Sequence, residues 1–195
     1  MRNDGDLIYG RLPGFHLSDR GRQMAAILAD YFRTQGIAYV VSSPLERAQE
    51  TAEPIGRALQ LEVRTDERLI EAGNHFEGSR FGFGQLARHP LRLRYLSNPL
   101  RPSWGEAYRS QLDRMQEALQ DIRGEVHGRA AVIVSHQSPI WTVRRTLESG
   151  RPWVSPLGRQ CALGSVTTVG YVADAPVSVE YFDPSARPTR SGGNS

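Results

Sequence analysis

Two residues with chemically useful side chains, Arg47 and His136, occupy matching places in the sequence. Each follows an uninterrupted apolar run, residues 37–41 or 130–134, and each stands close to a Ser-Pro pair. If both runs are parallel strands, the two side chains lie at one edge of a sheet, where helix N-termini attract anions. An arginine fork can hold two oxygens of an anion, and an imidazole can donate to another. The spacing predicts an anion site; the alternatives are a solvated arginine and a purely structural histidine.

The elements that would position these residues follow from the apolar pattern. A helix is expected after Ser18, a good N-cap, because apolar residues then recur every three or four positions. Residues 37–41 follow as a buried, β-branched strand. Ser43 is expected to cap the next helix, with Pro44 in its first position. Residues 61–64 are expected to form a short strand.

The second half of the chain continues the alternation after an irregular stretch. Residues 71–103 are rich in Gly, Arg and Pro and predict a loop-rich lid insertion with one helix near residues 85–95. Ser103 and Glu106 form a capping-box pattern ahead of a long helix. The remaining expected elements are a strand at 130–135, a helix at 138–148, and strands at 166–172 and 177–182. Strands alternating with helices predict an α/β fold with a mostly parallel sheet.

Composition narrows the class of protein and its partners. All 24 basic residues are Arg and the net charge is only +3, with the Arg residues scattered, so no nucleic-acid partner is expected. A phosphorylated or carboxylated small molecule fits this charge. Cys161 is the single cysteine, the first residues do not resemble a signal peptide, and no apolar run could span a bilayer. We therefore expect a cytoplasmic protein without membrane contact. The histidines show no metal-ligand spacing, so no metal or other cofactor is expected.

Four stretches follow one another along the chain: 10–14 with 17–21; 42–52, which reads S-S-P-L-E-R-A-Q-E-T-A; 68–71 with 76–78; and 132–136, which reads V-I-V-S-H. In this order they resemble the histidine phosphatase (phosphoglycerate-mutase-like) superfamily. The resemblance implies a three-layer α/β sandwich with a mostly parallel central sheet flanked by helices. The chain length fits one domain, expected over residues 1–183 with 71–103 as the lid insertion. Residues 184–195 are rich in Pro, Ser and Gly and are expected to form a disordered tail.

The resemblance gives roles to individual residues. Arg47 and His136 would neutralise the charge that spreads over the oxygens of a transferring phosphoryl group. Glu71 would protonate the leaving oxygen, for which it needs a raised pKa, and Glu77 is the competing carboxylate. Arg11 would line the phosphate entrance, and Asn3 matches the asparagine that follows the family's R-H-G-E. The family chemistry needs no metal.

One part that the resemblance implies is absent from the sequence. The R-H-G motif, whose histidine attacks phosphorus, occurs nowhere in the 195 residues. With Asn3 aligned, the motif and an apolar strand are expected just upstream of Met1. That first central strand is expected to pair between the strands that end at Ser42 and Ser135. We attribute its absence to a miscalled start site or a truncation, and expect the upstream codons to encode Arg-His-Gly.

These features favour a phosphomonoester hydrolase of the histidine phosphatase type that acts through a phosphohistidine intermediate on a phosphorylated small molecule. A phosphatase is preferred to a mutase because the chain is short. The alternatives are phosphoglycerate-mutase-type phosphotransfer, and an inactive relative in which Arg47 and His136 still bind a phosphate ligand. The lid insertion, residues 71–103, is expected to select the ester.

Overall fold

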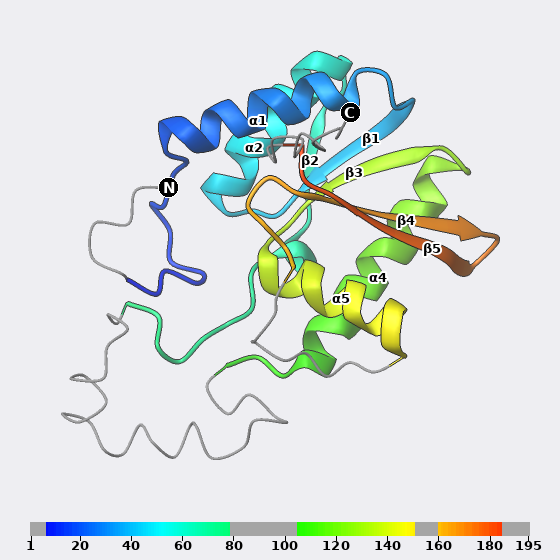
Figure 1. Ribbon diagram of the computed structural model, residues 1–195. Coiled ribbons are helices and arrows are strands. Elements are labelled where there is room, and N and C mark those ends of the chain that lie inside the picture. The colour runs from blue at the N-terminus through cyan, green and yellow to red at the C-terminus, as the bar shows by residue number, and fades with distance from the viewer. Residues whose placement is uncertain (1–6, 79–104, 151–159, 185–195) are drawn as a thin grey trace, which may run out of the picture.

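The computed structural model describes residues 7–78, 105–150 and 160–184. Its centre is a parallel sheet of order β2-β1-β3, formed by β1 (Ile37–Ser42), β2 (Val63–Thr65) and β3 (Ala130–Val134) (Figure 1). Val40 of β1 pairs with Val63 on one side and with Val132 on the other. Helices cover both faces of this sheet. The predicted α/β sandwich with a parallel central sheet is confirmed.

The expectation that a further strand lies between β1 and β3 is wrong. These two strands pair directly, from Ile37 opposite Ala130 to Ser42 opposite Val134. The pairing continues past the strand end, where the Ser43 N–H donates to the Val134 carbonyl at 2.9 Å. Both edges of β1 are therefore hydrogen-bonded, to β2 and to β3, and its backbone has no free groups for a further strand.

One face of the sheet is covered by α1 (Asp19–Phe32) and α2 (Glu46–Leu59). The Ser18 hydroxyl accepts the Gly21 N–H at 3.2 Å, which confirms the predicted N-cap of α1. Leu28 of α1 and Ile55 of α2 pack with Val40 and Val132 in one apolar cluster. This packing fixes α2, and with it the first turn that carries Arg47.

The predicted start of α2 is wrong. The helix begins at Glu46 with Leu45 as its N-cap, and no side chain caps it. Ser43 and Pro44 precede the helix. The Ser43 hydroxyl is instead 2.7 Å from His136 Nε2, and its contact with the Leu45 N–H is long, at 3.4 Å. Ser43 still belongs to the sheet through its backbone, so its hydroxyl points across to the end of β3 rather than to the helix.

The other face is covered by η1 (Glu67–Leu69), α4 (Tyr108–Val126) and α5 (Gln137–Ser149). Leu69, Met115 and Val143 pack here with Val41 of β1. The predicted capping box is wrong, because α4 begins two residues after Glu106 with Ala107 as its N-cap and no side-chain cap. The Glu106 carboxylate binds two arginines instead. Ser103 lies outside the described residues.

A hairpin of β4 (Val166–Val172) and β5 (Ala175–Phe182) completes the described fold and confirms the two closing strands. The pair is antiparallel and forms a separate two-stranded sheet within the described part of the chain. No helix among these residues is long and apolar enough to cross a membrane. The helix expected near residues 85–95, the rest of the lid after residue 78, and the tail from residue 185 lie outside the described ranges.

Candidate active site

Arg47 is held in a buried position at the junction between β1 and α2. Its Nη2 donates to the Gly10 carbonyl at 2.7 Å, and its guanidinium lies over the Tyr9 ring, 5.1 Å from the centroid. Only 8 % of the residue is exposed, and its Nη1 is buried without a hydrogen-bond partner in the described structure. Burial lowers the pKa of Arg47, and the charge of Glu71 opposes this shift. A buried cation with an unused donor is suited to bind an anion.

His136 lies at the matching junction, where β3 ends and α5 begins. It is the N-cap residue of α5, is 7 % exposed, and places Nε2 at 2.7 Å from the Ser43 hydroxyl. Burial lowers its pKa to about 3, and the positive charges of Arg47, Arg114 and Arg11 contribute. His136 is therefore neutral at pH 7, with its ring fixed by a serine from the neighbouring strand.

The structure thus brings Arg47 and His136 to the same edge of the sheet, as the sequence pattern predicted. The link between their elements is direct, because Ser43 precedes the Arg47 turn and bonds to His136. The charge of Arg47 also acts on His136, since it is the largest cause of the lowered His136 pKa after burial. The two residues therefore lie together in one candidate site.

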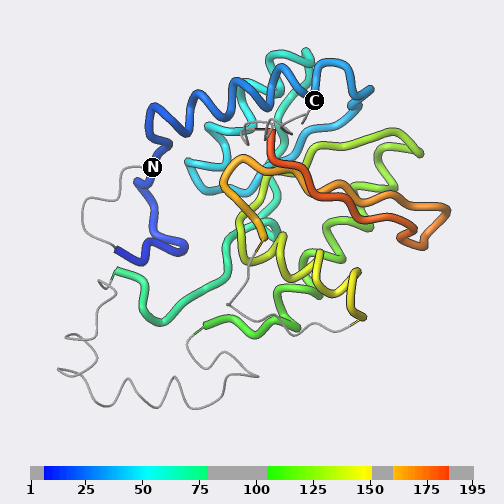
Figure 2. The backbone as a smooth tube through the Cα atoms, viewed as in Figure 1, coloured from blue at the N-terminus to red at the C-terminus, as the bar shows by residue number. Residues whose placement is uncertain are grey.

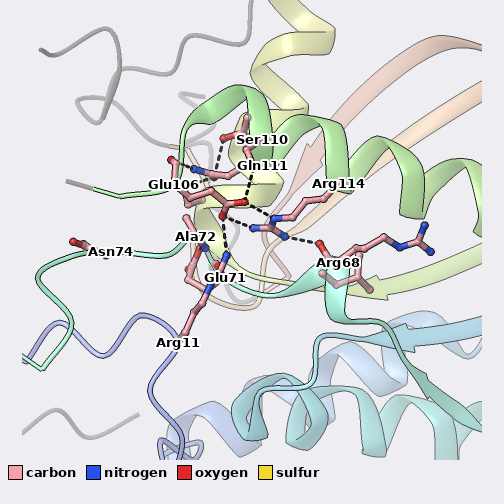
Figure 3. Close-up of polar contacts among 12 residues, drawn as sticks. Arg11, Arg68, Glu71, Ala72, Asn74, Glu106, Ser110, Gln111 and Arg114 are labelled. Atoms are coloured by element: carbon pink, nitrogen blue, oxygen red, sulfur yellow. Dashed lines mark hydrogen bonds and ion pairs between the residues drawn. The ribbon is translucent and has the colours of Figure 1, made fainter. Parts of the chain in front are cut away.

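Two loop segments close the site on a third side. Residues 7–18 run beside residues 71–78, and the Gly78 N–H donates to the Ile8 carbonyl at 2.9 Å (Figure 2). Arg11 reaches from the first loop to the second, where its Nε donates to the Glu71 carbonyl at 2.7 Å (Figure 3). This contact places Arg11 beside the predicted acid. Asn3 lies outside the described residues.

The negative charges of Glu71 and Glu77 both act on Arg47, since each opposes the lowering of the Arg47 pKa. Glu71 Oε1 accepts the Ala72 N–H at 2.8 Å, and Glu77 Oε1 accepts the Asn74 N–H at 3.1 Å. Glu71 has the larger effect on Arg47. The assignment of Glu71 as the acid therefore stays a prediction, with Glu77 as its competitor.

Glu106 and Arg114 were missed by the sequence analysis as members of this region. Glu106 accepts from Arg11 and Arg114 (Figure 3). The charge of Arg114 contributes to the lowered pKa of His136. Glu106 precedes its helix and is 95 positions from Arg11, so neither helical spacing nor a local motif indicates the contact. Within the described ranges, no three His, Cys, Asp or Glu side chains are arranged to hold a metal ion.

Comparison with known proteins identifies relatives over most of the chain. The sequence profile of the histidine phosphatase superfamily (branch 1) matches residues 2–184 of the chain. An uncharacterized protein of Mycobacterium tuberculosis is 46 % identical over 187 residues, which cover 95 % of this chain and 93 % of the relative. Phosphoserine phosphatase 1 of Hydrogenobacter thermophilus is 28 % identical over 64 % of this chain and 60 % of its own length.

Solved structures of phosphatases share the fold. A mycobacterial glucosyl-3-phosphoglycerate phosphatase matches with a TM-score of 0.61 and 26 % identity, over 75 % of this chain and 73 % of its own. The alpha-ribazole phosphatase of Shigella flexneri matches with a TM-score of 0.69 over 90 % of this chain and 87 % of its own. At 21 % identity, the second likeness concerns the fold alone.

Proposed function

Because this chain belongs to the histidine phosphatase superfamily, we propose that it hydrolyses phosphomonoesters of small molecules through a phosphohistidine intermediate. The observation that carries the proposal is the buried Arg47 guanidinium, whose Nη1 has no partner in the described part of the chain. A phosphoryl group would supply the missing acceptor. The relatives include phosphoserine phosphatase 1 and a glucosyl-3-phosphoglycerate phosphatase, which supports hydrolysis. A plant relative is named phosphoglycerate mutase-like protein 4, so mutase-type transfer stays the alternative.

In this proposal each described residue has one task. Arg47 binds the phosphoryl oxygens and stabilises the charge that develops on them during transfer. His136, which is neutral and held by Ser43, forms a hydrogen bond to the same phosphoryl group. Glu71 protonates the leaving oxygen, and Arg11 draws the anion toward the site. These residues bind and activate the ester, whereas the attacking histidine is expected from an R-H-G motif, which the 195 residues do not contain.

The binding half of the proposal is testable on the 195-residue chain by calorimetric titration with inorganic phosphate. Arg47→Gln is expected to weaken phosphate binding by about tenfold to a hundredfold, because charge-assisted hydrogen bonds contribute about 1.5–3 kcal/mol. Arg57→Gln is the matched control on the same helix, with a side chain 69 % exposed. It should bind phosphate like the wild type. Equal affinity of the Arg47→Gln protein would contradict the assignment.

The catalytic half is tested by release of inorganic phosphate from p-nitrophenyl phosphate. The assay compares the 195-residue chain with a version lengthened by the codons upstream of Met1. Turnover with a trapped, acid-labile phosphoprotein supports the phosphohistidine route. Phosphate binding without turnover in both proteins would instead establish the alternative, an inactive relative in which Arg47 and His136 still bind a phosphate ligand.

A further inference from the structure

The carboxylate of Glu106 lies between two arginines that come from different parts of the chain. Its Oε2 accepts from Arg11 Nη2 at 2.8 Å and from Arg114 Nη2 at 3.0 Å, and its Oε1 accepts from Arg114 Nε at 2.9 Å (Figure 3). The Glu106 side chain is 14 % exposed. Burial would raise the pKa of Glu106, but Arg114 and Arg11 outweigh it and hold the pKa below its ordinary value. Glu106 is therefore a charged, well-paired carboxylate.

Both arginines continue from Glu106 to the backbone of the segment that carries Glu71. Arg114 Nη1 donates to the Arg68 carbonyl, and Arg11 Nε donates to the Glu71 carbonyl at 2.7 Å. One carboxylate thus connects, through two guanidinium groups, to two carbonyls three residues apart. These carbonyls lie at either end of the short stretch that delivers Glu71 to the site.

The main chain of Glu106 is fixed to the same segment. Its N–H donates to the Gly73 carbonyl at 2.8 Å, and its carbonyl accepts from Gln111 Nε2 at 3.0 Å. Next to it, Gly105 forms an antiparallel bridge with Asn74. Backbone and side chain of Glu106 therefore hold residues on both sides of Glu71, so a displacement of the carboxylate is transmitted to the predicted acid.

Arg11 is oriented by the same arrangement. Its Nε and Nη2 are occupied by Glu71 and Glu106, while its Nη1 makes no hydrogen bond to the described residues. Its positive charge already reaches His136, where it contributes to the lowered pKa. An arginine fixed through two of its three nitrogens loses little side-chain freedom when the third meets an anion.

We propose that Glu106 is a positioning residue that sets Arg11 for the incoming phosphate and Glu71 for proton donation. The inference rests on the proposed phosphatase function and extends it to a residue outside the direct contact with the ester. Glu106 does not touch the phosphoryl group. Its effect on the reaction passes through the two arginines and through the backbone from Arg68 to Glu71.

The first test uses inorganic phosphate and the 195-residue chain, and it separates positioning from charge. Glu106→Gln removes a negative charge near the site, so an effect of charge alone would tighten phosphate binding. Positioning predicts the opposite, a loss of affinity, because Arg11 is no longer held. Glu106→Asp keeps the charge but shortens its reach, and it should also bind phosphate more weakly than the wild type. Tighter or unchanged binding in both variants would overturn the role in orienting Arg11.

The second test compares two esters in whichever form of the protein turns over. p-Nitrophenyl phosphate has a good leaving group that needs little protonation, whereas phenyl phosphate depends on a general acid. Glu106→Gln should lower kcat for phenyl phosphate by about tenfold to a hundredfold, and for p-nitrophenyl phosphate by clearly less. An equal loss on both esters, as expected from general loosening of the structure, would overturn the link to Glu71.

A matched control keeps these outcomes interpretable. Glu148 also binds two arginines, with 2.7 Å to Arg144 and 3.3 Å to Arg145, but it lies at the far end of α5 from His136. Glu148→Gln should leave phosphate affinity and the ratio of the two esters unchanged. If the wild type turns over neither ester, the proposed phosphatase activity is wrong. The effect of Glu106 on Arg11 is then still decided by the phosphate titrations.

Discussion

His136 is buried, feels the positive charges of Arg47, Arg114 and Arg11, and is hydrogen-bonded to the Ser43 hydroxyl. Burial, with the charges of the arginines, lowers the pKa and keeps His136 neutral, and the Ser43 hydroxyl lies 2.7 Å from its Nε2. His136 is therefore neutral, with one proton on its ring, and the positive charge that attracts an anion comes from the arginines. The same property has a consequence for the stability of the whole chain.

We expect the free energy of unfolding to depend on pH through His136. Its pKa is about 3 in the folded protein and about 6.5 in the unfolded chain, so between these values the unfolded state binds more protons. The stabilisation is fully present above about pH 6.5 and is lost as the pH falls toward about 3. The expected slope approaches about 1.4 kcal/mol per pH unit between about pH 5 and pH 6. Urea unfolding in phosphate-free buffers measures it.

His136→Gln should remove most of this slope, whatever its effect on stability at neutral pH. His127→Asn is the control, because His127 is exposed and its left-handed backbone, with φ of 48°, suits asparagine. The control should keep the slope of the wild type. The same slope in His136→Gln as in the wild type would show that other groups cause the pH dependence.

At the scale of elements, the site is built by two strand-to-helix junctions and by the loops 7–18 and 71–78. The second loop meets the residues before α4 at Gly105, which pairs with Asn74. A Cβ atom on Gly105 would come within 2.3 Å of the Gly73 carbonyl oxygen, so the two backbones approach as closely as glycine allows. This approach places Glu106 against the segment of Glu71. Gly105 is therefore a position where packing, rather than a turn, requires glycine.

Gly105→Ala should destabilise the protein by about 1–3 kcal/mol, because one of the two backbones must move. Gly124→Ala is the matched opposite, since Gly124 lies inside α4 and a Cβ there would meet nothing within 4 Å. It should stabilise the protein by up to about 1 kcal/mol through helix propensity. Urea denaturation of both variants measures the difference. Equal stability of the two variants would contradict the close approach at Gly105.

The elements could be predicted where local physics decides them. Ser18 and the apolar period that follows it gave the position of α1, and two apolar runs gave β1 and β3 with Arg47 and His136 at their ends. Local reasoning predicts Ser43 as a cap because a serine before a proline fits that role. Its hydrogen bond to His136 joins residues 93 positions apart, and no local pattern indicates it.

Contacts between distant segments were beyond such reasoning. Arg11 and Glu106 meet only because two loops fold together, and no spacing in the sequence encodes their contact. The expected strand between β1 and β3 failed for a related reason. The apolar, β-branched sequences of β1 and β3 show that each is a buried strand, but not that the two are neighbours. Strand order depends on the whole sheet.

At the scale of the molecule, the hairpin of β4 and β5 differs from the parallel sheet in how it is held. Arg123 of α4 donates to the Ala173 carbonyl at 2.9 Å and lies over the Tyr171 ring at 4.3 Å. Tyr31 of α1 meets Phe182 with ring centroids 5.4 Å apart. These contacts come from side chains, whereas β1 is held by backbone pairing on both edges.

We expect amide hydrogen exchange to be faster in β4 and β5 than in β1, because a two-stranded sheet has little stability of its own. Arg123→Ala should speed exchange in the hairpin and leave β1 unchanged. Arg109→Ala is the control, because Arg109 lies on the same helix in an exposed pair with Asp113. Mass-spectrometric exchange of the variants measures the effect. Slower exchange in the hairpin than in β1 would contradict this ranking.

The position of Cys161 gives the molecule a reporter of its own. This single thiol is 6 % exposed, and its backbone carbonyl accepts a hydrogen bond from Gln137, the residue that follows His136. A thiol-reactive dye can reach the sulfur only when the chain around it opens. The rate of labelling therefore follows local opening beside His136 without any introduced probe, and a ligand that tightens this region would slow it.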